Sequence, residues 1–470
     1  MTRITTIETL DRIGEKATVA GWAETVRKLG KILFIDLRDK DGHLQIVCSP
    51  EQSALYETAK SIRPEYVIRV TGRIAKRSEK NVNKKQPTGA IELQPEQLEI
   101  LNTSLTPPFE IDNEIRQASE ELRLKYRYLD LRHERLRHNL RVRSDLLWFV
   151  RNWLHERGFT EIQTPILSKS TPEGARDFLV PSRLQKGRFF ALPQSPQQYK
   201  QLLMVAGVEK YFQIAPCFRD EDARADRSPG EFYQLDIELS FVNQEEILQL
   251  TEEMFTQMVA KIFPGKHVTT TPWPRLRHAD VMKKYGTDKP DLRQNKEDNN
   301  ELAFAWVIDF PLFAKQTKDD YFYGAGDKLA PSHHMFTAPR EEDIPLLETA
   351  PEKVRAYQHD LVLNGVEVGG GSIRIHRPEI QEKVFDLIGF TKDQKKLFKH
   401  LMTAFQYGVP PHGGIAPGIE RLLFAILGEK SVKEVAAFPL TSEGRDPMMD
   451  SPSRVTPAQL RDLGLRLDKN

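Results

Sequence analysis

The chain has 470 residues, and its 68 Lys and Arg against 67 Asp and Glu give a formal net charge of +1. That balance argues against a protein that binds nucleic acid through overall charge alone, and 39% hydrophobic residues argue against a disordered chain. No apolar run approaches the ~20 residues that span a bilayer, and the N-terminus carries no apolar signal stretch. Cys48 and Cys217 are too few for a disulfide framework or a four-cysteine zinc site. We expect a soluble, cytoplasmic protein with no membrane contact and two or three domains.

The first hundred residues alternate short apolar runs with turn residues. Five runs are typical of strands, and a helix-like piece at 51–62 separates the third from the fourth; the runs are 17–23, 31–37, 43–49, 66–76 and 90–101. Five strands with a helix after the third is the element order of an OB-fold barrel. Such barrels commonly bind single-stranded nucleic acid, although a purely structural barrel would give the same pattern. We therefore expect an OB-fold domain at 1–103.

Basic residues gather in two stretches. Residues 60–85 hold nine Lys and Arg against two acids, and residues 116–143 hold nine against four. Runs of charge are usually solvated faces, but two of them beside one small barrel fit a phosphate backbone better.

The rest of the chain predicts a larger α+β body. Residues 104–133 are expected to be a linker, because Pro107 and Pro108 disfavour regular structure. A long helix is predicted from residue 134, with Leu136 and Leu140 among its periodic apolar residues and Gly158 at its end. Strand-like runs at 231–241, 305–311 and 365–376 then alternate with helical stretches, so a second, larger domain is placed at 134–470.

Three segments combine arginine, acidic residues and glycine around expected strands, namely 158–178, 218–238 and 408–424. Six stretches narrow the comparison further: RYLDLR (127–132), TPEGARDF (171–178), ALPQSPQQYKQLL (191–203), FRDEDARADR (218–227), VIDFPLF (307–313) and EVGGGSIRIH (367–376). In this order they resemble the class II aminoacyl-tRNA synthetases, and among those the bacterial-type aspartyl-tRNA synthetases. The resemblance covers nearly the whole chain.

The resemblance implies a fold and a reaction. The expected fold class is α+β, with the N-terminal OB-fold barrel followed by a catalytic domain whose mainly antiparallel sheet is flanked by helices. The expected enzyme uses ATP and Mg²⁺ to activate L-aspartate as aspartyl-adenylate, and then transfers aspartate to the 3′ end of tRNA(Asp). It is expected to be a homodimer, with the helix from residue 134 at the interface, and not to bind DNA.

Other functions stay open. One is an enzyme that charges both tRNA(Asp) and tRNA(Asn); leucine at position 29 favours the strict form. Others are a ligase for asparagine or lysine, a synthetase-like RNA-binding protein that has lost catalysis, and an OB-fold module on an unrelated scaffold.

The chemistry itself favours arginine. Joining a carboxylate to the α-phosphorus of ATP brings two anions together, so positioning and cationic groups matter more than a proton shuttle. Arg219 and Arg421 are the expected catalytic residues, the first on the α-phosphate and the substrate carboxylate, the second on the γ-phosphate and the adenine face. A lone arginine near a helix start is usually a surface ion pair, and here the resemblance reverses that preference.

The resemblance also implies the remaining nucleotide contacts. Glu221 and Phe232 are expected at the adenine, although Phe232 would equally suit a strand core. Asp360 and Glu367 are the expected magnesium ligands. The run Gly369–Gly371 suggests a close approach of backbone to ligand, with a bulge as the alternative. The expected ATP-binding set is Arg219, Glu221, Ser228, Phe232, Glu367, Gly418, Ile419, Glu420 and Arg421.

The amino-acid pocket must distinguish a second carboxylate from its amide, which needs fixed positive charge. The resemblance assigns that role to Lys200 and Arg374, with Asp236 orienting both. It places the substrate ammonium against three further side chains and a histidine pair in a closing loop. The complete expected set is Glu173, Ser195, Gln197, Lys200, Arg219, Asp236, His333, His334 and Arg374.

In the barrel, the residues expected to contact the anticodon are Arg27, Leu29, Phe34 and Gln45. Phe34 would stack on a base, whereas from the pattern alone a buried phenylalanine is favoured.

The sequence departs from the family in two places. The usual inserted domain is absent near 294–305, and Gly230 lengthens the loop before the strand at 231. Contacts near Ser228 therefore depend on how that loop folds.

Overall fold

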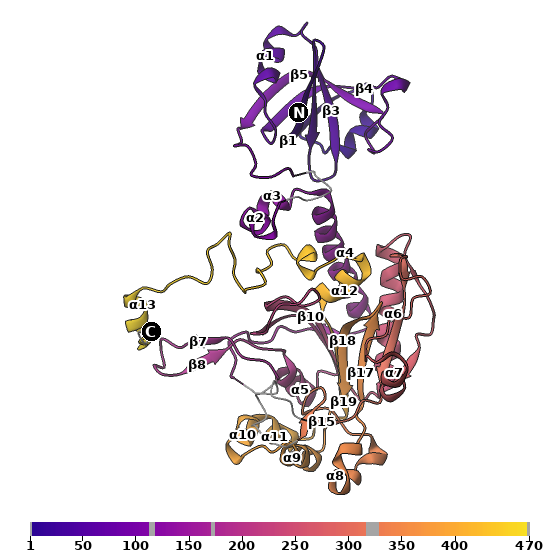
Figure 1. Cartoon of the computed structure of the whole chain (residues 1–470), viewed down its shortest axis with the longest axis vertical. Helices are drawn as coiled ribbons and strands as arrows, with labels where there is room; N and C mark the ends of the chain where they lie inside the picture. Colours follow the sequence, from indigo (N-terminus) through magenta and orange to yellow (C-terminus); the bar gives the residue numbers. More distant parts are fainter. Residues whose placement is uncertain (1, 112–117, 171–173, 316–328, 468–470) are drawn as a thin grey trace. The chain divides into compact units, whose positions relative to one another are not determined.

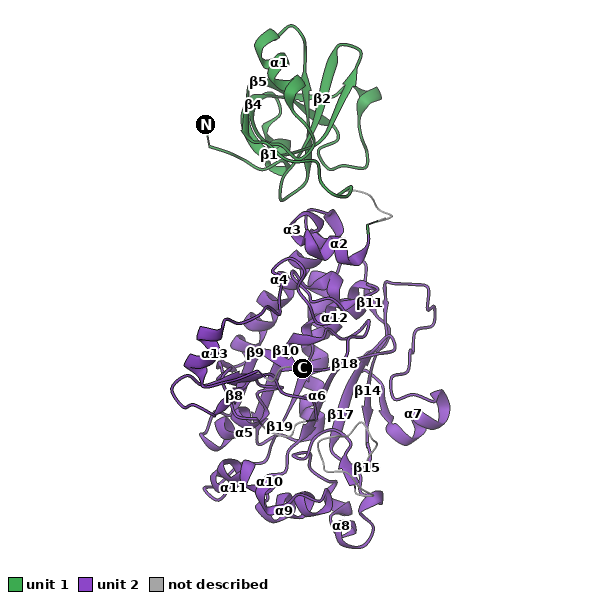
Figure 2. Ribbon diagram, turned by 60° about the vertical axis from the view of Figure 1, so that its left-hand side comes forward, with its two compact units in different colours: residues 1–118 green, residues 119–470 purple. Residues whose placement is uncertain are grey.

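The structure is a computed structural model that describes residues 2–111, 118–170, 174–315 and 329–467. The chain divides into two compact units, residues 1–118 and 119–470 (Figure 2). Residues 119–133, expected to be the end of the linker, fold within the second unit as α2 (Glu120–Lys125) and α3 (Arg127–Asp130). The physical reason is the buried guanidinium of Arg127, which donates to the backbone carbonyls of Lys433, Ala436 and Ala437.

The first unit is a closed five-stranded barrel in the order β1-β2-β3-β5-β4. Its elements are β1 (Lys16–Leu29), β2 (Ile32–Arg38), β3 (His43–Cys48), α1 (Ser53–Ser61), β4 (Val67–Lys76) and β5 (Ile91–Asn102), with a 3-10 helix at Ile7–Arg12 before them. All neighbours are antiparallel except β3 and β5, which run parallel. The five expected strands and the helix after the third are confirmed.

Alternation along each barrel strand separates the core from the outer face. Leu33, Ile35 and Leu37 of β2 are buried, as are Leu44 and Ile46 of β3. Successive strand residues point to opposite faces, so the residues between them lie on the outside of the barrel.

The second unit is built on an eight-stranded sheet in the order β12-β14-β17-β18-β19-β10-β9-β6 (Figure 1). The strands are β6 (Thr160–Glu161), β9 (Lys210–Arg219), β10 (Gly230–Ser240), β12 (Arg275–Arg277), β14 (Phe304–Ile308), β17 (Gln358–Leu363), β18 (Val366–Ile373) and β19 (His412–Pro417). Only the β12–β14 and β6–β9 pairs are parallel. The sheet is therefore mainly antiparallel, and the expected α+β fold class with an OB-fold barrel is confirmed.

One face of this sheet is covered by three helices, α4 (Glu134–Glu156), α6 (Gln244–Ile262) and α12 (Ile419–Leu427). Leu146 of α4, Phe255 of α6 and Leu422 of α12 share one apolar cluster with strand residues such as Ile237 and Leu361. The predicted long helix thus packs on its own sheet, and it ends at Gly158, whose φ of +80° favours glycine.

The opposite face of the sheet carries polar residues such as Asp236. A second, smaller apolar cluster is formed outside the eight strands. Four helices gather there, α8 (Leu346–Thr349), α9 (Pro378–Leu387), α10 (Lys392–Leu397) and α11 (Lys399–Phe405), and Figure 1 shows them together below the sheet. The remaining named elements are α5 (Gln197–Val205), α7 (His278–Tyr285), α13 (Pro457–Leu463), and the two-stranded pairs β7–β8 (Leu179–Pro181, Phe189–Ala191), β11–β13 (His267–Val268, Glu301–Leu302) and β15–β16 (Phe313–Lys315, Leu329–Pro331). Among the described helices, none combines the length and the apolar composition that a membrane crossing needs.

Candidate active site

A cavity of about 330 Å³ lies on the polar face of the large sheet, which is within the usual range for a small-molecule site. Strand alternation creates it, because Leu235 and Ile237 of β10 face the helices while Asp236 faces the cavity. Most of the predicted site residues line it: Ser195, Gln197, Lys200, Arg219, Glu221, Ser228, Phe232, Asp236, His333, His334, Glu367, Arg374, Gly418, Glu420 and Arg421. Glu173 lies outside the described residues.

At one end of the cavity two buried cations sit among two buried acids. The ammonium of Lys200 lies 2.9 Å from Asp236 and 3.2 Å from Glu238, and Arg374 donates to both oxygens of Glu238 at 3.0 and 3.1 Å. The expectation that Asp236 orients both cations is therefore corrected: Asp236 holds Lys200, and Glu238 holds Arg374. Glu238 was missed, although its spacing of two from Asp236 places both side chains on one face of β10.

The same four groups set each other's ionisation. Burial alone would raise the pKa of Glu238, but the charges of Arg374 and Lys200 outweigh it and lower that pKa to about 2. For Asp236 burial dominates, and its pKa is raised although Lys200 opposes the shift. The arrangement fixes a guanidinium and an ammonium where water is largely excluded, which strengthens their attraction for an anion.

Three polar atoms at this end have no hydrogen-bond partner among the residues that the structure describes. They are Asp236 Oδ1, Gln197 Nε2 and His333 Nδ1, and all three are buried. An unpaired buried polar atom is costly. These atoms therefore mark where a polar ligand would complete the site.

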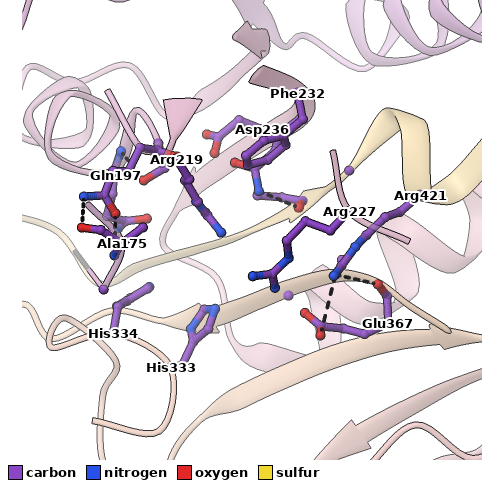
Figure 3. A pocket seen from close by; sticks show the side chains of 18 of the residues that line it. Ala175, Gln197, Arg219, Arg227, Phe232, Asp236, His333, His334, Glu367 and Arg421 are labelled. Carbon is purple, nitrogen blue, oxygen red and sulfur yellow. Dashed lines mark hydrogen bonds and ion pairs between the residues drawn. The ribbon is translucent and has the colours of Figure 1, made fainter. Parts of the chain in front are cut away.

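The predicted histidine pair closes the cavity from the loop before Met335. The rings of His333 and His334 lie 4.4 Å apart, and Arg374 donates to His334 Nε2 at 2.6 Å. Figure 3 shows His333 facing the space into which Arg219 and Arg227 point. Desolvation in the pocket, followed by the charge of Arg374, lowers the pKa of His333 to about 3. The pKa of His334 also falls, by burial and the neighbouring His333, so both rings are neutral at pH 7.

The other end of the cavity carries Arg219 and Phe232, on neighbouring strands. The guanidinium of Arg219 lies 5.0 Å from the centre of the Phe232 ring, a cation–π contact. Its Nε lies 3.4 Å from the backbone carbonyl of Gln194. No ion pair joins Arg219 to a carboxylate of the described residues, so its charge is available to a ligand. Phe232 is half-buried beside the cavity and outside the apolar core, which removes the alternative of a core phenylalanine.

Two more arginines line this end, each held by acids. Arg421 donates to the carbonyl of Asp226 at 3.0 Å and to its carboxylate at 3.2 Å, and also to the carbonyl of Glu367 at 3.0 Å. Arg227 pairs with Glu221, the predicted adenine contact. Asp226 and Arg227 were not predicted, although both belong to the stretch 218–227 that carried the resemblance.

Two predicted nucleotide contacts have structural side chains. Ile419 is fully buried in the apolar core and is not among the residues that line the cavity. Glu420 is also buried; it lies 2.7 Å from Arg143 and accepts from the backbone N–H of Tyr233 at 3.0 Å. This glutamate therefore fixes α4 and β10 to the start of α12. Gly418, just before it, lines the cavity.

The run of three glycines has two uses. A Cβ on Gly369 would lie 2.7 Å from Pro417 Cα, and one on Gly371 would lie 2.2 Å from the carbonyl oxygen of Gly414, so both are required by the close approach of β18 to β19. Gly370 lies in the cavity wall, where a Cβ would lie 3.3 Å from His333 Nε2. Backbone packing and an open ligand space thus both demand glycine.

The predicted magnesium ligands lie on neighbouring strands. Asp360 of β17 and Glu367 of β18 flank a register shift after Leu361. Asp360 is buried, and its pKa is raised by burial and by the charge of Glu367. Glu367 lines the cavity, whereas Asp360 does not. Among the described residues no group of three or more His, Cys, Asp or Glu is arranged to hold a metal, so a cation here would rely on two carboxylates and on the nucleotide.

The predicted anticodon residues share the outer face of the barrel. Phe34 pairs across the strands with Arg27, and Gln45 pairs with Asp36, which accepts from Arg27 at 2.6 Å. Phe34 is partly exposed and Ile35 is buried, so the outward orientation required for stacking is the one adopted. Leu29 is 74% exposed at the end of β1.

Comparison with known proteins adds to this geometry. The model of the tRNA synthetases class II (D, K and N) matches residues 119–442, and that of the OB-fold nucleic acid binding domain matches residues 17–101. Aspartate--tRNA(Asp/Asn) ligases from Rubrobacter xylanophilus and Syntrophomonas wolfei are each 40% identical; both alignments cover 97% of this chain, with 95% and 97% of the respective relatives.

The alignment lengths reveal a difference in size. The Rubrobacter alignment has 579 positions but covers 97% of 470 residues, or about 456, so about 123 positions have no residue in this chain. The absence of an inserted domain near 294–305 stays a prediction, because the alignment length does not locate the missing positions.

Solved structures share the fold. An asparaginyl-tRNA synthetase from Pyrococcus horikoshii, complexed with asparaginyl-adenylate, gives a TM-score of 0.74 at 23% identity and covers 97% of this chain and 100% of its own. An asparaginyl-tRNA synthetase from Entamoeba histolytica gives 0.75 at 24% identity, covering 95% and 100%. With a family match over well over half of its length and relatives at 40% identity along almost all of it, the chain belongs to the class II tRNA synthetases of the D, K and N group.

Proposed function

We propose that this protein joins L-aspartate to ATP as aspartyl-adenylate and transfers the aspartate to the 3′ end of tRNA. The observation that carries the proposal is the buried pair of Lys200 and Arg374, held by Asp236 and Glu238 at the closed end of the cavity. Two fixed cations suit the second carboxylate of aspartate. They would repel a lysine side chain, and the amide NH₂ of asparagine would bring a donor to these two donors where aspartate brings an acceptor oxygen, a mismatch that can cost on the order of 10⁴ in rate.

The rest of the amino acid is bound toward the centre of the cavity. Ser195 and Gln197, with Glu173, are proposed to meet the substrate ammonium, and His333 and His334 to cover the ligand. Both histidines are neutral and so add no charge. Arg219 is proposed to hold the substrate α-carboxylate, since its planar fork matches two oxygens.

Activation then needs only alignment and charge. One oxygen of the α-carboxylate attacks the α-phosphorus, the bond from that phosphorus to the oxygen bridging it to the β-phosphate breaks, and pyrophosphate leaves with the electron pair. Arg219 is also proposed to bind the α-phosphate, and Phe232 to stack on the adenine. Arg421 is proposed to bind the γ-phosphate, which would replace the carboxylate of Asp226 as its partner. Such preorganised cations stabilise the charge that develops in the transition state.

Asp360 and Glu367 are the proposed magnesium ligands. The donor set fits, because magnesium takes one or two carboxylates together with phosphate oxygens and water, and because two acids on adjacent strands, one of them buried, favour a cation between them. A bound magnesium ion would neutralise part of the charge on the phosphates of ATP.

For transfer, the 3′-hydroxyl of the terminal ribose attacks the carbonyl carbon of the adenylate and AMP leaves. We propose that the outer face of the barrel reads the anticodon through Arg27, Leu29, Phe34 and Gln45. Replacing Phe34 with alanine removes a stacking contact worth roughly 1–3 kcal/mol. The kcat/KM for tRNA charging should therefore fall, while aspartate-dependent pyrophosphate exchange should stay unchanged. Equal loss in both reactions would instead indicate damage to the fold.

A second candidate concerns the tRNA. The relatives at 40% identity are named aspartate--tRNA(Asp/Asn) ligases, which favours charging of both tRNA(Asp) and tRNA(Asn) over the strict form suggested by Leu29. Charging purified tRNA(Asp) and tRNA(Asn) side by side decides between them. The cytoplasm, where these tRNAs are charged, is the proposed location.

A homodimer through α4 is also proposed. Trp148 of this helix is 61% exposed, while Leu140 and Leu147 are only half-buried. Light scattering at micromolar concentration should give the mass of two chains, and the mass of one chain would contradict the proposal.

The central test is ATP–pyrophosphate exchange with each amino acid, with magnesium and without tRNA. Exchange is expected with aspartate alone and should be lost in Arg374→Met. Arg377→Met is a matched control, because Arg377 is exposed and pairs with Glu341 outside the cavity. Exchange with asparagine or lysine, or full activity of Arg374→Met, would contradict the proposal.

A further inference from the structure

The strongest unassigned feature is a lysine beside the proposed magnesium ligands. Lys289 belongs to the polar segment between α7 and β13, and its ammonium lies 3.4 Å from Glu367 Oε2. It has no other ion pair among the residues that the structure describes. The side chain is 36% exposed, so it lies at the edge of the site rather than in the core.

The segment that carries Lys289 is anchored by its own contacts. Arg293 pairs with Asp291 at 2.8 Å, and a Cβ on Gly365, in the turn between β17 and β18, would lie 3.3 Å from Asp291 Cβ. Farther along, Glu301 accepts from the backbone N–H groups of Gln294 and Asn295 at 2.8 and 2.9 Å. The position of Lys289 at the acid pair is therefore a property of the fold.

Glu367 lies between two cations with different attachments. Arg421 is 3.7 Å from the Glu367 carboxylate but is also fixed by Asp226 and by the Glu367 carbonyl. Within the described ranges, Lys289 forms an ion pair with Glu367 alone. The charge of Lys289 also reaches Asp360, where it opposes the effect of Glu367 and Asp288 on the pKa of that buried acid. Lys289 thus acts on both proposed ligands, and it is the cation that can leave.

We propose that Lys289 is a positioning residue that occupies the cation position on Glu367 in the free enzyme, so that magnesium enters together with ATP and not before it. This inference rests on the proposed magnesium role of Asp360 and Glu367. A monovalent ammonium lowers the attraction of the acid pair for a free divalent ion, because it neutralises part of the negative charge. When the nucleotide binds with its metal, Glu367 would hold the ion, and the ammonium of Lys289 would turn toward the phosphate oxygens, which supply the replacement charge.

The test uses Mn²⁺ as the probe, since carboxylates bind it in the manner of magnesium, and it uses the full chain without ATP. Free Mn²⁺ is followed by its electron paramagnetic resonance signal. Lys289→Met should bind Mn²⁺ tighter, on the order of tenfold for the removal of one charge at this range. Lys289→Arg, which keeps the charge, should bind like the original chain. Lys283→Met on α7 is the matched control, because it removes an exposed lysine without an ion pair to the acids.

A second readout is the magnesium concentration that gives half-maximal aspartate-dependent exchange, which should fall in Lys289→Met and stay unchanged in Lys283→Met. Equal Mn²⁺ affinity in the two methionine variants, or no Mn²⁺ binding to any variant, overturns the inference. If the unsubstituted chain showed no aspartate-dependent exchange, the proposed function would be refuted separately, since the Mn²⁺ titration does not depend on catalysis. Unchanged melting temperatures exclude a merely structural effect.

Discussion

The two ends of the cavity differ in how their charges are held. At the amino-acid end, Lys200, Arg374, Asp236 and Glu238 are almost fully buried and paired side chain to side chain. At the nucleotide end, Arg227, Asp226 and Glu221 come from a partly exposed loop, and only Arg219 is without an acid partner among the described residues. The first arrangement suits selection of one small ligand by a rigid site. The second suits a larger anion that replaces protein carboxylates as it binds.

The largest expected effect comes from the amino-acid end. Glu238→Gln removes the carboxylate that holds Arg374 and leaves buried cations undercompensated, which typically costs about 3–5 kcal/mol. We expect both a large fall in the free energy of unfolding and a loss of aspartate-dependent exchange, measured by denaturation and pyrophosphate exchange. Glu231→Gln, an exposed acid on the same strand, should change neither. A stable but inactive Glu238→Gln variant would mean that the amino-acid end does not depend on this buried ion pair for its rigidity.

Arg219→Met should separate catalysis from stability. Its guanidinium contacts a ring and a carbonyl but forms no ion pair with a described carboxylate, so the free energy of unfolding should change little. Loss of a preorganised charge at the reacting phosphate should lower the rate of exchange by about 10²–10³. A strong destabilisation in calorimetry would place Arg219 with the structural cations instead.

Acid should lower the free energy of unfolding through two buried histidines. Burial holds the pKa of His412 down to about 4 and that of His359 to about 3, whereas an unfolded chain protonates histidine near 6.5. The unfolded state therefore binds more protons below pH 6.5, and stability is lost as the pH falls toward these folded values, by about 1.4 kcal/mol per unit for each buried ring. Chemical denaturation at pH 7 and pH 5 measures how much the free energy of unfolding falls per pH unit, and His412→Gln should reduce this slope. An unaltered slope would exclude His412 as a source.

The smallest effect is expected at the nucleotide end. Asp226→Asn weakens the contact that ATP must displace from Arg421, a half-buried pair whose contribution we expect to be about the 0.2–1 kcal/mol of exposed pairs. The KM for ATP should fall by roughly two- to fivefold, with the free energy of unfolding and the KM for aspartate unchanged. A rise in the KM for ATP would show that Asp226 positions Arg421 for the nucleotide, and the two ends would then be built alike.

Much of this could be predicted from the sequence, because it depends on local pattern. The barrel strands, the long helix ending at Gly158 and the outline of the site followed from periodicity, turn residues and six motif stretches in order. The pattern could not predict on which side of the barrel wall Phe34 lies. Alternation shows that neighbouring side chains point to opposite faces, but not which of them points inward. Closure of the barrel on Ile35 decided it.

The composition and the order of motifs in the sequence alone determined the fold class, the family and which side chains carry positive charge for the reaction, since these depend on residue type and on spacing within single elements. Only the tertiary structure decided the partners. Arg374 and Glu238 are 136 residues apart, Arg421 and Asp226 are 195 apart, and Lys289 meets Glu367 through an anchored segment. Ion pairs between distant strands depend on sheet order and register, which bring together residues that no local pattern connects.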